Sequence, residues 1–135
     1  MSSAEIDRPL PNKIFQMMLA GMTRYHPADK KVYGAGEKTD RIIQLKAYTR
    51  WGGYYLLREN LLGTLEPGKY ADFMVLDRDF LTIPETDIPN IKVLMTVVGG
   101  KTEHLADSLA REVGMQPVGA TTWKDPIPPG WWAGE

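Results

Sequence analysis

The chain has 135 residues, of which 43% are hydrophobic and 24% charged, proportions typical of a folded globular protein. Its 16 basic and 17 acidic residues give a net charge of −1 without a basic stripe, which argues against nucleic acid as a partner. No apolar run is long enough to span a bilayer, and the absence of cysteine excludes disulfides and cysteine-ligated metals, so we expect a soluble, cytoplasmic protein.

The first expected element is an amphipathic helix over residues 12–25, where apolar side chains recur at helical spacing. Its methionines, Met18 and Met22 among them, are expected in the core. Residues 26–38 contain turn formers without periodicity and predict a surface loop. His26 follows the helix end, where a positive charge favours the helix dipole, so we expect a capping role rather than metal binding.

A second helix is expected over residues 39–60, with Thr39 as its N-cap. Apolar residues occupy most of its circumference, so it should have neighbours on more than one side. Gly52 and Gly53 inside it predict a bend or a close approach of another segment.

Three aromatic residues of this helix, Tyr48, Trp51 and Tyr55, are candidate ligand-binding residues, because their rings could stack on a bound molecule. At helical spacing the same rings, together with Tyr54, are more commonly core residues. The sequence therefore predicts a packed aromatic cluster, with ligand stacking as the alternative.

The period changes after Leu61, from helical spacing to short apolar runs typical of strands. Gly99-Gly100 is a two-residue hairpin signal that leads from the apolar run at 92–98 into residues 101–105, and Met74 is expected in the core. The expected elements are strands at 70–76, 92–98 and 101–105, a loop or single turn at 81–90 and a short helix at 106–113. Helices first and a small antiparallel sheet second predict an α+β fold.

Residues 116–135 form a tail rich in proline and tryptophan, which disfavours regular structure. Trp131 and Trp132 are two large apolar rings that need a surface to pack against. The predicted organisation is one domain over residues 1–115 followed by this tail.

The stretch LGTLEPGKYADFMVLDRDFLTIPETDIPNIKVLMTVVGGK resembles the C-terminal end of the metal-dependent amidohydrolase superfamily, closest to its "amidohydrolase family 3" type. The preceding helix, with its A-Y-T triplet, and the dipeptide Thr23-Arg24 extend the resemblance to about residues 5–105. The positions that fit the family pattern are Gly63, Leu65, Gly68, Ala71, Asp72, Leu76, Asp77, Val93, Thr96, Val98, Gly100 and Lys101.

This resemblance implies that the sheet belongs to the small β-sandwich that stands beside the family's catalytic barrel. The matched glycines suit turns, and Asp72 is expected to accept hydrogen bonds from turn amides at the start of a strand. These residues are structural rather than catalytic.

Catalysis in the family uses zinc or a similar divalent metal, which lowers the pKa of a bound water molecule, and an aspartate after the last barrel strand that handles its proton. This sequence has only two histidines, His26 and His104, in no H-x-H arrangement, and His104 is expected in solvent. Asp7, in Ile6-Asp7-Arg8-Pro9, matches the family's catalytic aspartate by its distance from Thr23-Arg24. We interpret Asp7 as a relic of that site and expect no metal or other cofactor; the alternative is an exposed aspartate.

Three functions follow from these residues. The first is a stand-alone or truncated amidohydrolase-like C-terminal domain without hydrolase activity by itself. The second is a binding or interaction module that uses the face once covered by the barrel. The third is one chain of a two-chain, metal-dependent hydrolase of C–N bonds, in which Asp7 completes the site. An over-apolar helix and open sheet edges further predict a homo-oligomer, most simply a dimer, with Trp131 and Trp132 docked across it.

Overall fold

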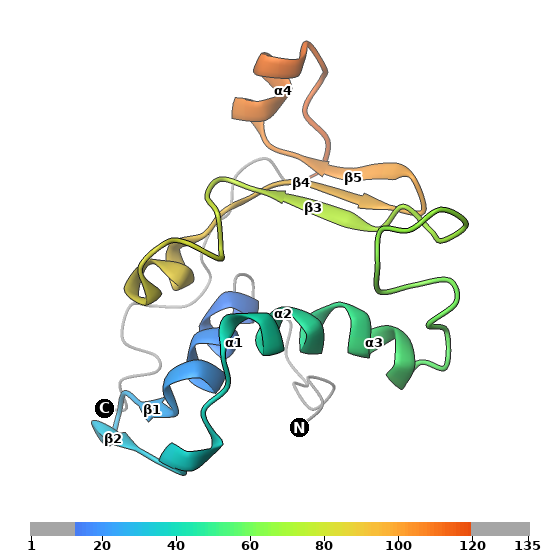
Figure 1. The fold of residues 1–135 in the computed structure, drawn as a ribbon. Coiled ribbons are helices and arrows are strands. Elements are labelled where there is room, and N and C mark those ends of the chain that lie inside the picture. Colours follow the sequence, from blue (N-terminus) through green and yellow to red (C-terminus); the bar gives the residue numbers. More distant parts are fainter. Residues whose placement is uncertain (1–12, 120–135) are drawn as a thin grey trace.

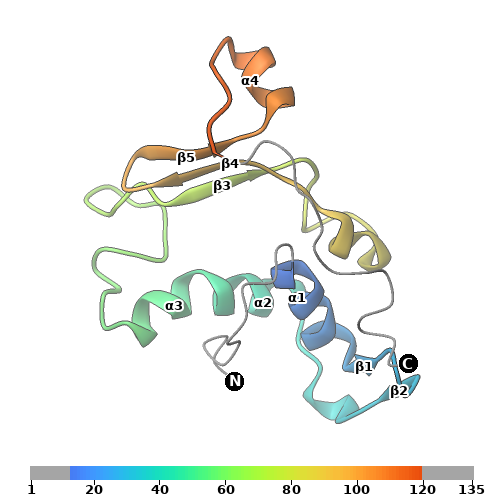
Figure 2. The same ribbon diagram turned by 180° about the vertical axis from the view of Figure 1, so that it is seen from behind.

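The computed structural model describes residues 13–119, which form an α+β fold, as predicted (Figure 1). The three-stranded sheet separates α4 (Asp107–Val113) on one side from α1 (Lys13–Thr23), α2 (Arg41–Tyr48) and α3 (Arg50–Tyr55) on the other, and the reverse view shows the same arrangement (Figure 2). The predictions for Asp7, Trp131 and Trp132 lie outside the described residues. In chain order the elements are α1 (Lys13–Thr23), β1 (Tyr25–His26), β2 (Lys31–Val32), η2 (Ala35–Glu37), α2 (Arg41–Tyr48), α3 (Arg50–Tyr55), β3 (Phe73–Leu76), η3 (Glu85–Asn90), β4 (Val93–Val98), β5 (Lys101–Leu105) and α4 (Asp107–Val113).

The larger sheet is antiparallel, with strand order β3-β4-β5. β4 and β5 are joined by the predicted hairpin, in which Gly99 and Gly100 have φ values of 57° and 80°. Both positive angles suit a two-residue turn that matches the twist of the strands, so the hairpin prediction is confirmed. Each strand pair contains one register shift, between Val75 and Leu76 and between Thr96 and Val97.

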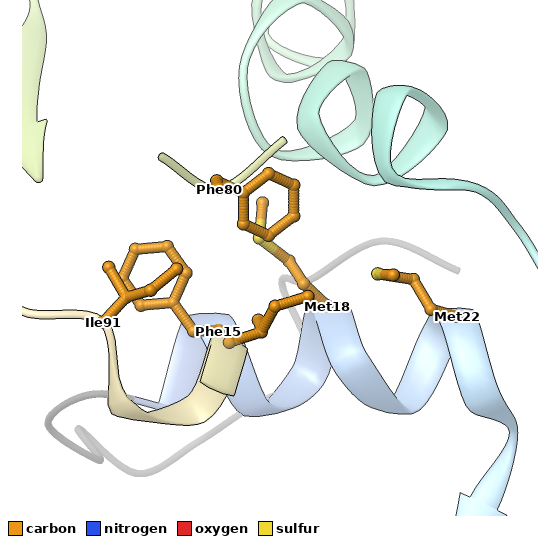
Figure 3. Packing of buried hydrophobic residues seen from close by; sticks show 6 residues of the cluster. Phe15, Met18, Met22, Phe80 and Ile91 are labelled. Carbon is orange, nitrogen blue, oxygen red and sulfur yellow. The ribbon is translucent and has the colours of Figure 1, made fainter. Parts of the chain in front are cut away.

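The core lies between α1, η3 and the segment that precedes η3, and not beneath the centre of the sheet (Figure 3). The rings of Phe15 and Phe80 pack with their centroids 6.4 Å apart, and Ile88 and Ile91 are almost fully buried beside them. Met18 and Met22 complete this cluster, which confirms their predicted place in the core. Helix α1 is thereby held through η3 to the start of β4.

The prediction of a single helix over residues 39–60 is wrong. Thr49 (φ −127°, ψ −90°) interrupts the helix and divides it into α2 and α3. The Thr49 hydroxyl donates to the carbonyl of Leu45 at 2.6 Å, a local bond that competes with continuation of the helix. Gly53 permits the expected close approach: a Cβ there would lie 2.9 Å from the carbonyl oxygen of Leu62.

The N-cap of α2 is Asp40 and not Thr39, since the Asp40 carboxylate accepts from the Ile43 amide at 2.7 Å. Thr39 instead joins α2 to α1, and its hydroxyl donates to the carbonyl of Gly21 at 3.2 Å. The buried Gln44 side chain donates to the same hydroxyl. A Cβ on Gly21 would overlap the Gln44 amide, so glycine is what lets this polar contact form between the two helices.

Residues 26–38, expected to be an irregular loop, include a short hairpin of β1 and β2 and the 3-10 turn η2. His26 belongs to β1 and does not cap α1, which ends at Thr23; its imidazole lies 3.1 Å from the Asp29 carboxylate. Arg24 takes a left-handed conformation (φ 56°) at the base of this hairpin, where its guanidinium bonds the carbonyl of Tyr33 and the carboxylate of Glu37.

Candidate functional site

Asp72, which the sequence predicts to bind turn amides at the start of a strand, bonds the hairpin turn that follows β4. Its Oδ1 accepts from the amide of Gly99 at 2.6 Å, and the carbonyl of Ala71 accepts from the amide of Gly100 at 3.2 Å. A carboxylate that accepts from a backbone amide makes a charge-assisted hydrogen bond, stronger than a neutral one. The predicted role of Asp72 is therefore confirmed, and the turn is the one between β4 and β5.

Asp77 makes the equivalent contact at the other end of β3. Its Oδ1 accepts from the amide of Lys92 at 2.8 Å, while its own amide donates to the Lys92 carbonyl at 3.0 Å. The two aspartates that match the family pattern thus fasten both ends of β3 to the segments flanking β4.

Lys69 fastens the turn that precedes β3. Its ammonium group donates to the carbonyl of Glu59 and to the hydroxyl of Thr64, each at 2.7 Å, and pairs with Glu66 at 3.1 Å. The hydrogen bond from Lys69, with a second from Thr64, lowers the pKa of the Glu66 carboxyl below its ordinary value. Lys69 and its partners thus hold this turn in place, as Asp72 and Asp77 hold the ends of β3.

The two histidines lie in different sheets, His26 in β1 and His104 in β5. His104 is partly buried and not solvated as expected, with its Nε2 3.2 Å from the carbonyl oxygen of Val93. Among residues 13–119, no three side chains of histidine, cysteine, aspartate or glutamate gather closely enough to hold a metal ion. The described part of the chain therefore does not fit the zinc that the family resemblance implies.

The three candidate ligand-binding aromatics are not brought together as one group. Tyr48 ends α2 and packs against the core, and its burial raises the pKa of its hydroxyl. Trp51 and Tyr55 project from α3 with 46% and 67% of their surface exposed. The prediction that these rings and Tyr54 form a packed cluster is wrong for the three on α3, and ligand stacking stays a prediction. Met74, also expected in the core, is 48% exposed on β3.

Exposed apolar side chains continue past α3, where the sequence predicted more helix. Leu56 and Leu57 follow Tyr55, and Leu57 is 87% exposed in a left-handed conformation (φ 55°). Periodicity alone would have placed both leucines in the core. Their position after the end of α3 is what indicates that they are exposed. We call the following set the α2–α3 surface: Ile42, Ile43, Trp51, Tyr54, Tyr55, Leu56 and Leu57.

The contacts described above define an α+β domain whose motif residues build turns and strand ends. A family model described as "Amidohydrolase family" matches residues 15–104, two thirds of the chain, and the chain belongs to this family. Searches of curated proteins and of solved structures gave no match. Within residues 13–119, no helix is long and apolar enough to cross a membrane.

Proposed function

We propose that this chain is an amidohydrolase-type domain that acts by binding another polypeptide and does not hydrolyse amides by itself. The observation that carries the proposal is the α2–α3 surface, in which large apolar side chains lie exposed on consecutive elements. Large apolar side chains that lie exposed on neighbouring elements are typical of protein interaction sites. The lack of cysteine is consistent with a cytoplasmic location for such a domain.

The partner that we propose first is a second copy of the chain, which gives a homodimer. The exposed fractions on the α2–α3 surface, from 36% for Ile43 to 87% for Leu57, correspond to about four fully exposed large side chains. At about 200 Å² each, they offer on the order of 800 Å², the area that each partner contributes to a standard stable interface. Aromatic rings such as Trp51 and Tyr55 commonly supply most of the energy of such contacts.

We expect light scattering during size exclusion to give a mass near twice 15.2 kDa for the full chain. Leu57→Glu should weaken this dimer at least about tenfold, because it places a charge in an apolar contact. Leu65→Glu is the matched control, since Leu65 is 70% exposed but lies outside the α2–α3 surface. A monomer at high protein concentration, or equal effects of the two variants, would count against the homodimer.

We also expect no metal-dependent hydrolysis of amides, esters or urethanes by the isolated protein. The chain has no cysteine, its two histidines lie in different sheets, and residues 13–119 bring no three metal-ligating side chains together. The measurement is elemental analysis after dialysis, combined with hydrolysis assays in added zinc. Stoichiometric zinc together with activity that is lost in Asp7→Asn would instead favour the two-chain or self-sufficient hydrolase, with Asp7 as its base.

A further inference from the structure

One edge of the larger sheet has no partner among the described residues. β5 is bonded at Leu105 by Val118, through hydrogen bonds of 2.9 and 3.2 Å in both directions. β3, at the opposite edge, pairs only with β4 within residues 13–119. It also presents Phe73 and Met74, 38% and 48% exposed, where edge strands ordinarily present charges.

Within residues 13–119, the backbone groups of β3 that face away from β4 can be identified from those that bond it. The carbonyl of Ala71 and the amide of Asp77 both bond the segment that contains β4. Because the backbone groups of successive residues in a strand point to alternate sides, those of Met74 and Leu76 point away from β4. Met74 lies at the middle of this open edge.

We propose that β3 pairs antiparallel with β3 of a second copy, about a two-fold axis at Met74. This inference rests on the proposed homodimer and specifies how its two sheets join. Each Met74 amide donates to the Met74 carbonyl of the other copy, and Asp72 stands opposite Leu76 of the second copy. Asp77 stands opposite Ala71 of the second copy, so neither aspartate faces its own equivalent and no like charges oppose each other.

The same axis also places the α1–α3 layers of both copies on one side of the joined sheet. A two-fold axis between antiparallel edge strands runs perpendicular to the sheet, so both copies keep α1, α2 and α3 on one side of the joined sheet. Since α4 lies on the other side in each copy (Figures 1 and 2), only the α1–α3 layers meet beneath the six strands. One symmetry operation therefore closes the open edge and brings two apolar helix layers side by side.

Met74→Pro in the full-length chain tests the backbone pairing. Proline removes an N–H that points away from β4, so β3 and β4 remain paired and the circular dichroism spectrum should be unchanged. We expect the dimer to weaken at least tenfold in light scattering, while Met74→Ala, which keeps the N–H, stays dimeric. A folded Met74→Pro that is as dimeric as the original chain would overturn the β3 pairing and leave the homodimer intact.

Single cysteines test the register, because the chain has no cysteine of its own. A hydrogen-bonded pair places its Cα atoms about 5.5 Å apart, within the range that a disulfide spans. Met74→Cys should therefore form a covalent dimer on mild oxidation. Met115→Cys, at a methionine with a matching 47% exposure, should not. Equal cross-linking of the two variants would overturn the register, and a monomeric parent chain would overturn both the register and the homodimer.

Discussion

Phe15→Ala is expected to lower the free energy of unfolding by about 3–5 kcal/mol, the usual loss when a buried aromatic ring is removed. Phe15 is 3% exposed and packs its ring against Phe80, beside the almost fully buried Ile88 and Ile91. The cavity would open at the junction of α1, η3 and the start of β4. The measurement is the shift in the midpoint of urea unfolding.

Tyr70→Ala is the control for this substitution, since Tyr70 is an aromatic residue with 54% of its surface exposed. We expect its loss to change the unfolding free energy by about 0.5 kcal/mol, as for most surface positions. If the two variants shifted the midpoint equally, α1 would not be packed against η3 in solution.

Gly99→Val is expected to cost about 1–3 kcal/mol of unfolding free energy. Gly99 has a φ of 57°, a conformation that a β-branched side chain adopts only with strain. Strain here reaches further than the turn, because the Gly99 amide is also the donor to Asp72 at the start of β3. Thermal unfolding followed by circular dichroism measures the loss.

Gly99→Asn separates backbone strain from the mere presence of a side chain at this position. Asparagine tolerates the left-handed conformation, and Asn-Gly is a preferred pair in this kind of turn, so its effect should be a few tenths of a kcal/mol. A Gly99→Val protein as stable as Gly99→Asn would contradict the turn that joins β4 and β5.

The sequence predicts the sheet better than the helices, and the reason is physical. A hairpin depends on residues next to each other, and Gly99-Gly100 directly after the apolar run of residues 92–98 contains most of the information needed. The helix break at Thr49 depends on a balance between a side-chain bond to Leu45 and the regular backbone ladder. Propensity alone does not resolve such a balance.

The candidate site shows a second limit of the sequence. Helical spacing says which side chains share a face, but not whether another element covers that face. Trp51 and Tyr55 therefore looked like core residues, although they lie exposed on α3. Gln44 was missed for the opposite reason, since this polar residue is buried by its contact with Thr39, just before α2, and by its close approach to Gly21 of α1.

The sequence positions of the core residues determine when the core can fold during synthesis. Phe15 is near one end of the described chain, whereas Phe80, Ile88 and Ile91 follow the whole of α2 and α3. During synthesis the apolar side chains of α1 leave the ribosome long before their partners exist, and closing so long a loop is slow. The contacts of α1 with η3 can therefore form only after η3 has emerged, so we expect this core to form late in synthesis.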